Sequence, residues 1–276
     1  MSNGIIRDIK AFYYRRGNVE QPQKYKIHID KRRTITDLVF KLEHTSLTFS
    51  TQLEPLRNEF LHLQSLQDEL ITAVKILLET DVIIVDSQVK ADALGESGSI
   101  FAKLKEQGSS ATAHAWTRLS LSWKIFLYSA RCFQDCVYKA ILHAQHEPVG
   151  PQTSMSTCVS GDAWRNEASV GKLIATRLPD YPNWFIRMRK LRNALKKGLS
   201  VQSVWQGQEH FIELCEQRWS DGFTENTKAY ALKLEFAIES LKMCMASAEL
   251  IRVAYDETRM RKEARRRRVA EKEADQ

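Results

Sequence analysis

Residues 182–200 read PNWFIRMRKLRNALKKGLS and have the pattern of an amphipathic helix. Pro182 suits a first helical turn, where the N–H that proline lacks would have no partner in any case. Gly198 is typical of the position just past a helix C-terminus, and Lys196 and Lys197 lie where cations complement the helix dipole. Apolar side chains recur at helical spacing along one face: Phe185, Met188, Leu191 and Leu195. The stretch therefore predicts an amphipathic helix.

The opposite face of this helix is strongly basic. Its cations are Arg187, Arg189, Lys190, Arg192, Lys196 and Lys197. No Asp or Glu occurs between Asp180 and Glu209. A solvated face of an ordinary helix accounts for this pattern, and so does a surface that contacts phosphates, because Arg and Lys supply most contacts to nucleic-acid backbones. On the second interpretation, the RNA-binding residues are Arg187, Arg189, Lys190 and Lys196.

Residues 184–198, WFIRMRKLRNALKKG, resemble the signature helix of HEPN domains. These are small helical bundles common in prokaryotic toxins and phage-defence ribonucleases. The pattern of that family is an Arg, a polar residue that is often Asn, a few variable residues and a His, often followed by Gly. Arg192 and Asn193 match the first two positions, whereas Lys197 stands where the His is expected. The resemblance is confined to this helix and to an all-helical setting.

The resemblance implies a metal-free site for RNA cleavage, built where two copies of the chain meet in a dimer. Carried over, the catalytic residues are Arg192 as the phosphate clamp, Asn193 as its polar helper and Lys197 in the place of the His. A His has a pKa of about 6.5 and can take the 2′-OH proton and return one to the leaving oxygen. Lysine has a reference pKa of about 10.4 and is a poor base unless burial lowers it. A site that binds RNA but cleaves it weakly or not at all is therefore an open alternative.

Hydrophobic periodicity predicts further helices on both sides of this one. They are expected at about 34–47, from Pro55 to about Val85 or beyond, at 113–146, at 164–178 and from Thr224 past Val253. Residues 25–30 alternate like a short strand, and a hairpin is expected about Gln206 and Gly207. The predicted fold class is all-α, an antiparallel helical bundle with a small β-hairpin after the signature helix.

Three regions are expected along the chain. Residues 1–30 form an N-terminal segment, and residues 31–258 form the helical bundle, with a HEPN-like core at about 113–258. Residues 259–276 form a basic tail, helical or disordered, whose eight Lys and Arg against four acidic residues supply +4 of the formal net charge of +7. Such a tail is either a solvated helix end or an electrostatic attachment to RNA or to an acidic partner.

Three pairs of side chains on the predicted 113–146 helix have ordinary structural interpretations. The pairs are Arg131 with Asp135, Cys132 with Cys136, and His143 with His146. The Arg–Asp pair has the spacing of a surface salt bridge, and a buried or half-buried pair that orients a site is the alternative. The Cys and His pairs have the spacing of metal ligands, but no further ligands of suitable spacing follow, so we expect buried thiols, no metal and no cofactor. The five Cys are odd in number and scattered, which argues against a disulfide framework.

Several classes of protein are excluded by what the 276 residues lack. No apolar run is long enough to cross a bilayer, and the N-terminus has no secretory apolar region, so we expect a cytoplasmic protein without a membrane partner. No phosphate-binding loop, Gly-x-Ser-x-Gly or His-Glu-x-x-His occurs, which excludes common nucleotide hydrolases, esterases and zinc proteases.

Three hypotheses remain open. The first is a HEPN-like protein of a bacterial toxin–antitoxin or phage-defence system that binds or cuts RNA, acts as a homodimer and associates with an antitoxin or another defence-complex subunit. If it is an enzyme, it is a metal-independent endoribonuclease. The second is a non-enzymatic helical adaptor or a dimerisation subunit of a larger complex. The third is a helical subunit unrelated to HEPN domains, with a chance match in one helix.

Overall fold

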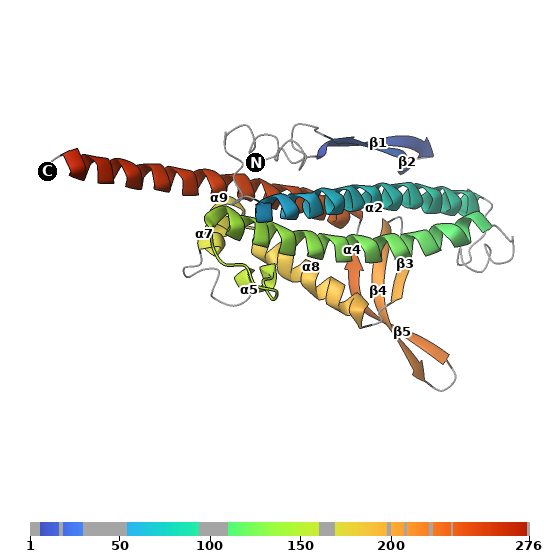
Figure 1. Ribbon diagram of the computed structural model, residues 1–276. Coiled ribbons are helices and arrows are strands. Elements are labelled where there is room, and N and C mark those ends of the chain that lie inside the picture. Colours follow the sequence, from blue (N-terminus) through green and yellow to red (C-terminus); the bar gives the residue numbers. More distant parts are fainter. Residues whose placement is uncertain are drawn as a thin grey trace. The chain divides into compact units, whose positions relative to one another are not determined.

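Three long helices, of 40, 36 and 41 residues, dominate the described part of the chain (Figure 1). The computed structural model describes residues 6–16, 19–29, 54–93, 110–159, 169–197, 200–206, 209–220, 223–232 and 234–274. The described helices are α2 (Glu54–Ala93), α4 (Ser110–Gln145), α5 (Met155–Val159), α7 (Ser169–Arg177), α8 (Tyr181–Lys196) and α9 (Leu234–Ala274). The strands are β1 (Ile6–Arg16), β2 (Val19–Ile29), β3 (Ser200–Gln206), β4 (Glu209–Ser220) and β5 (Phe223–Leu232).

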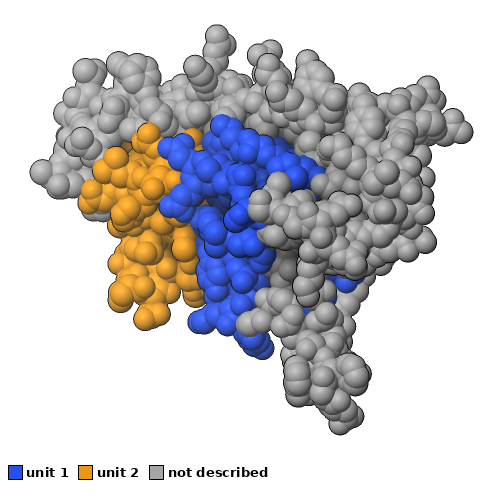
Figure 2. All heavy atoms as spheres, turned by 90° about the vertical axis from the view of Figure 1, so that its right-hand side faces the viewer, with its two compact units in different colours: residues 1–30, 68–130, 188–242 blue, residues 31–67, 131–187, 243–276 orange. Residues whose placement is uncertain are grey.

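Contacts along the chain group it into two compact units, coloured separately in Figure 2. The first unit contains residues 1–30, 68–130 and 188–242, and the second contains residues 31–67, 131–187 and 243–276. The division falls within α2, α4, α8 and α9, so each of these helices contributes a segment to both units. The domain boundaries expected from sequence, near residues 30, 112 and 258, stay predictions.

In the first unit, α2 and α4 run antiparallel. Ser129 donates a hydrogen bond of 2.8 Å to Glu69, and Arg118 forms an ion pair of 3.9 Å with Glu79. The residue number rises from Glu69 to Glu79 along α2, whereas the number of the contacting residue on α4 falls from Ser129 to Arg118. The two helices therefore run in opposite directions. The core between them contains the predicted stripes of both helices: Leu70, Val74, Leu77, Leu119, Trp123 and Phe126.

In the second unit, α4 is antiparallel to α8 and parallel to α9. Gln134 of α4 contacts Cys244 of α9, and His146, just after α4, contacts Lys262 farther along α9. Tyr181 of α8 contacts Gln134, and Phe185, one turn later on α8, contacts Arg131, which lies earlier on α4. α8 therefore runs in the opposite direction to α4. Successive long helices therefore alternate in direction, as in an up-and-down bundle. The predicted helical bundle is confirmed.

The strands form two antiparallel sheets. β1 pairs with β2, and β3, β4 and β5 follow one another as a meander. The strand expected at residues 25–30 is confirmed as the end of β2, and the hairpin expected about Gln206 is confirmed as β3 and β4.

The predicted start of the last helix at Thr224 is wrong. Residues 223–232 form β5, which pairs with β4 from Ser220↔Phe223 to Ile212↔Leu232, and α9 begins only at Leu234. The Thr224-Glu-Asn-Thr motif resembles a helix cap, but an edge of β4 is available for pairing, and aromatic and β-branched residues favour a strand there.

The remaining predictions from sequence concern the connecting segments and the C-terminal tail. The helix expected at 34–47 and the turns expected at 95–109 lie outside the described residues. The loop expected at 147–161 contains a short helix, α5, and the described part of the helix expected at 164–178 is α7. The basic tail is helical as far as Ala274.

Among the described helices, none combines the length and the apolar character that a membrane span requires.

Candidate nucleic-acid interface

Helix α8 has the boundaries and the buried face expected from its sequence. The Asp180 carbonyl accepts a 3.1 Å hydrogen bond from the Trp184 N–H at the start of the helix, and the Lys197 N–H donates to the Asn193 carbonyl at 3.1 Å at its end. Its four predicted apolar anchors and Tyr181 are all buried. One face of α8 is therefore packed in the core, and the helical period places its polar side chains on the opposite face.

Six of the seven predicted site residues form one surface on α8, which we call the basic stripe. It consists of Arg189, Lys190, Arg192, Asn193, Lys196 and Lys197, all in the first unit. Arg189, Arg192 and Lys196 follow one another at spacings of three and four, so they are neighbours along the helix surface, and Lys190, Asn193 and Lys197 repeat that spacing one residue later. The seventh residue, Arg187, is exposed and belongs to the second unit.

The cations of the basic stripe are not neutralised within the described part of the chain. None of the five cationic members forms an ion pair with a described residue, and Lys190, Lys196 and Lys197 are exposed. Arg192 is half-buried, and its Nε is buried without a hydrogen-bond partner among the described residues. Because like charges four residues apart, such as Arg192 and Lys196, destabilise a helix by roughly 0.2–0.5 kcal/mol, an anion bound along the stripe would relieve a standing repulsion.

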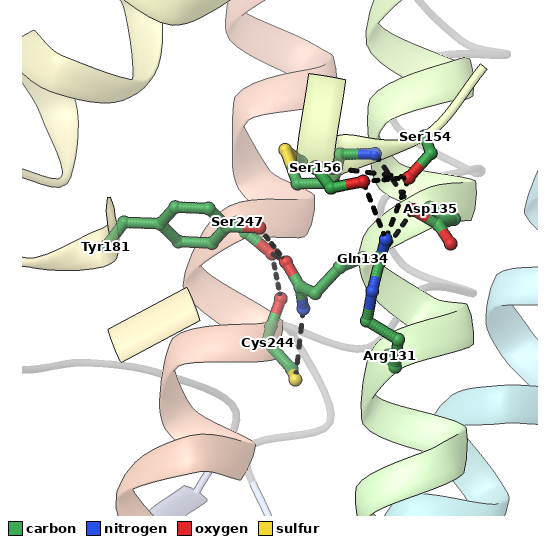
Figure 3. A network of polar contacts seen from close by, with 9 residues as sticks. Arg131, Gln134, Asp135, Ser154, Ser156, Tyr181, Cys244 and Ser247 are labelled. Carbon is green, nitrogen blue, oxygen red and sulfur yellow. Dashed lines mark hydrogen bonds and ion pairs between the residues drawn. The ribbon is translucent and has the colours of Figure 1, made fainter. Parts of the chain in front are cut away.

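A buried polar network in the second unit supports the N-terminal half of α8 (Figure 3). The guanidinium of Arg131 forms an ion pair with Asp135, donates to Ser154 Oγ at 2.8 Å and lies 4.9 Å from the ring centre of Phe185. Asp135 also accepts the Met155 N–H at 2.8 Å, which holds the start of α5. The prediction of a surface salt bridge is therefore wrong: Arg131 is only 5% exposed, because the α5 segment and Phe185 cover it.

Gln134 joins three helices in the other half of this network. Tyr181 of α8 donates its hydroxyl proton to Gln134 Oε1, and Gln134 Nε2 donates to Cys244 Sγ of α9 at 3.1 Å. Ser247 adds a 3.3 Å hydrogen bond to the same Gln134 oxygen, as Figure 3 shows. Burial raises the pKa of Tyr181 well above its usual value, so the phenol remains a donor at neutral pH. Sequence reasoning missed Gln134, although it lies at core spacing from Ala130 and Val137.

The prediction of two buried thiols on α4 is wrong for Cys132, which is exposed, and Cys136 is half-buried. All five cysteines are free, and burial raises the pKa of Cys136, Cys158 and Cys244 to about 12, so these are neutral thiols at pH 7. His146 accepts a 2.9 Å hydrogen bond from Lys262 of α9, and its pKa is lowered by burial and by that lysine.

The C-terminal part of α9 is a second basic surface, which we call the basic arm (residues 259–274). Every side chain from Arg259 to Lys272 is exposed. Ion pairs of 3.7 and 3.5 Å within the helix hold Arg259 to Glu263 and Arg261 to Glu257. The run from Arg265 to Arg268 forms no ion pair with a described residue. The arm belongs to the second unit, so the two basic surfaces are described independently.

An apolar row is exposed on α4 in the first unit. Leu121, Ile125 and Tyr128 are 54%, 43% and 41% exposed and lie at spacings of four and three, so they share one helix face.

Comparisons with known proteins found no relative of the chain. No protein-family model matches the chain, and neither a curated protein nor a solved structure matches it.

Proposed function

We propose that the chain binds RNA through the basic stripe of α8, as a HEPN-like protein of a toxin–antitoxin or phage-defence system. The observation that supports this best is the row of five cations on one helix face without an acidic partner among the described residues. Phosphate backbones neutralise such a row, and each phosphate contact releases a counterion and strengthens binding.

Within the stripe, Arg192 is the residue best suited to a phosphate. It is half-buried, so its planar guanidinium is held more firmly than the exposed lysines beside it, and a fixed guanidinium can donate two parallel hydrogen bonds to phosphate oxygens. Asn193 and Lys197 lie beside it and supply a polar helper and a second cation. RNA binding is the primary activity that we propose, because metal-independent cleavage also needs a base, and no His lies in the stripe.

Replacing Arg192 by Ala is expected to weaken binding of single-stranded RNA at least about fourfold at 0.15 M salt, the effect of one phosphate contact. The measurement is fluorescence anisotropy with labelled RNA in metal-free buffer. Arg252→Ala is the matched control, because Arg252 is an exposed arginine of a helix outside the stripe, and this change should leave binding unaltered. Equal losses in both variants, or no RNA binding by the unaltered protein, would contradict the proposal.

The same incubation separates cleavage from binding. Fragments of total RNA or tRNA that disappear in both Arg192→Ala and Lys197→Ala would assign a nuclease in which Lys has taken the place of the motif His. RNA retained intact but bound less tightly by Arg192→Ala would assign a protein that holds RNA without cleaving it.

The apolar row of α4 favours a second candidate, a helical adaptor or dimerisation subunit. Three large apolar side chains on one helix face gain about 25 cal/mol for each Å² of surface that a partner removes from water. The row is also compatible with a homodimer, which the HEPN resemblance implies.

Light scattering tests this candidate directly. The unaltered protein is expected to have twice the mass of one 31.8 kDa chain. The double variant Leu121→Gln/Ile125→Gln should have the mass of a single chain, whereas Leu61→Gln, which alters an exposed leucine of α2 outside the row, should remain dimeric. A single-chain mass for the unaltered protein at all accessible concentrations would leave the row without this role.

A further inference from the structure

Three different kinds of metal-ligand side chain meet in the second unit. Glu59 and His62 come from α2, and Cys136 comes from α4. Glu59 and His62 are three residues apart, so they project from the same face of α2 on successive turns. One ligand atom from each residue, a carboxylate oxygen, an imidazole nitrogen and a thiol sulfur, lies within 4.8 Å of the other two. The spacing along α4 pairs Cys136 with Cys132, but the other members of this group come from α2.

Glu59 carries a polar atom that the described part of the chain does not satisfy. The Cys136 thiol donates a hydrogen bond to the Glu59 carboxylate. Glu59 Oε2 is nevertheless buried without a hydrogen-bond partner among the described residues. Burial of a carboxylate oxygen without a partner is costly, and buried carboxylates are usually paired or coordinate a metal. A cation beside Glu59 would satisfy this oxygen.

We propose that Glu59, His62 and Cys136 bind a divalent cation of the zinc class. A sulfur, a nitrogen and an oxygen ligand together suit zinc and cobalt, whereas magnesium and calcium take oxygen ligands. Three protein ligands leave a fourth tetrahedral position for water or another ligand. The proposal is independent of RNA binding by the basic stripe.

The ligand atoms need only a small movement to bind such a cation. With bonds of about 2.0–2.3 Å, the atoms of a tetrahedral site lie roughly 3.3–3.8 Å apart. His62 is exposed, so its ring can rotate toward Glu59 and Cys136 without disturbing the core, and an ion can enter from the same side. The bound ion would connect α2 to α4, and we therefore expect it to stabilise the folded chain.

The test is titration of the purified full chain, stripped of metal under reducing conditions, with Co²⁺ followed by Zn²⁺. A thiolate ligand to Co²⁺ produces a charge-transfer band in the near ultraviolet, and tetrahedral Co²⁺ produces intense visible bands. Both should appear at one Co²⁺ per chain and disappear on addition of Zn²⁺. Zn²⁺ should also raise the Tm.

Variants assign these signals to the three ligands. Cys136→Ser should abolish the charge-transfer band, and His62→Gln should weaken Co²⁺ binding by more than the roughly tenfold to hundredfold that loss of an outer-shell partner costs. Because His62 is exposed, His62→Gln remains informative even where Cys136→Ser impairs folding. Cys132→Ser, one turn earlier on α4, should keep the band. Absence of a band in the unaltered protein, unchanged affinity in His62→Gln, or loss of the band in Cys132→Ser but not in Cys136→Ser would overturn the proposal.

Discussion

Asp135→Ala should lower the free energy of unfolding by about 3–5 kcal/mol, because it leaves the guanidinium of Arg131 buried without its counterion. Arg131 is 5% exposed, so little of its guanidinium reaches water. Its remaining partners are neutral hydroxyls, Ser154 Oγ at 2.8 Å and Ser156 Oγ at 3.5 Å, and its Nε already has no partner among the described residues. The substitution also removes the acceptor of the Met155 N–H at the start of α5.

The companion variant Arg131→Met separates the buried charge from the rest of the interaction. Asp135 is 31% exposed, so its carboxylate can be hydrated after the guanidinium is removed and can keep its hydrogen bond to Met155. Arg131→Met should therefore cost less than Asp135→Ala, and the double variant should be more stable than Asp135→Ala alone. Urea unfolding followed by circular dichroism measures all three. A loss below about 1 kcal/mol for Asp135→Ala would mean that the pair behaves like an exposed ion pair after all.

These outcomes also bear on the basic stripe. Phe185 of α8 lies on the Arg131 guanidinium, and Tyr181 of α8 donates to Gln134 on the same helix, α4. The polar network therefore determines how the N-terminal half of α8 is held. Variants of the network that still fold provide a test of whether RNA binding depends on the charges of α8 alone or also on how firmly the helix is fixed.

Local spacing was sufficient to predict α4, α8 and the buried face of each. The anchors Phe185 and Leu195 are buried and Lys190 is exposed as expected, because the period of a helix determines which side chains share a face. The same reasoning placed Trp123 and Phe133 of α4 in the core. The face of α8 that carries the candidate site could therefore be predicted before its surroundings were known.

Contacts between distant segments could not be predicted in this way. Arg131 is buried by the segment around Ser154, which lies 23 residues farther along the chain. At Thr224, where a helix cap was expected, β5 pairs with β4 instead. Glu59 and His62 meet Cys136 only because α2 and α4 pack against each other. In each case the partner lies in another element, and the spacing of residues along one element contains no information about it.

Replacing four cations of the basic stripe together should nearly abolish RNA binding. The variant is Arg189→Gln/Lys190→Gln/Arg192→Gln/Lys196→Gln. Glutamine is a good helix former and has a similar length, so α8 should persist while its charge is lost. Because each phosphate contact to a single strand contributes about 0.7 to the slope of log K against log[salt], the slope should become less steep by about 3. At 0.15 M salt the affinity should fall on the order of a hundredfold.

The basic arm provides a control with the same loss of charge. Replacing Arg265 to Arg268 by Gln also removes four positive charges, but from the exposed end of α9 in the second unit. If the stripe makes the phosphate contacts, this second variant should retain most of the salt slope, because a general decrease in net charge alters distant electrostatics, which salt screens within about 8 Å. The reverse result, an unchanged slope in the stripe variant and a flatter slope in the arm variant, would show that RNA binds to the basic arm of α9 instead. The side chains of α8 would then be an ordinary solvated face, as composition alone also allows.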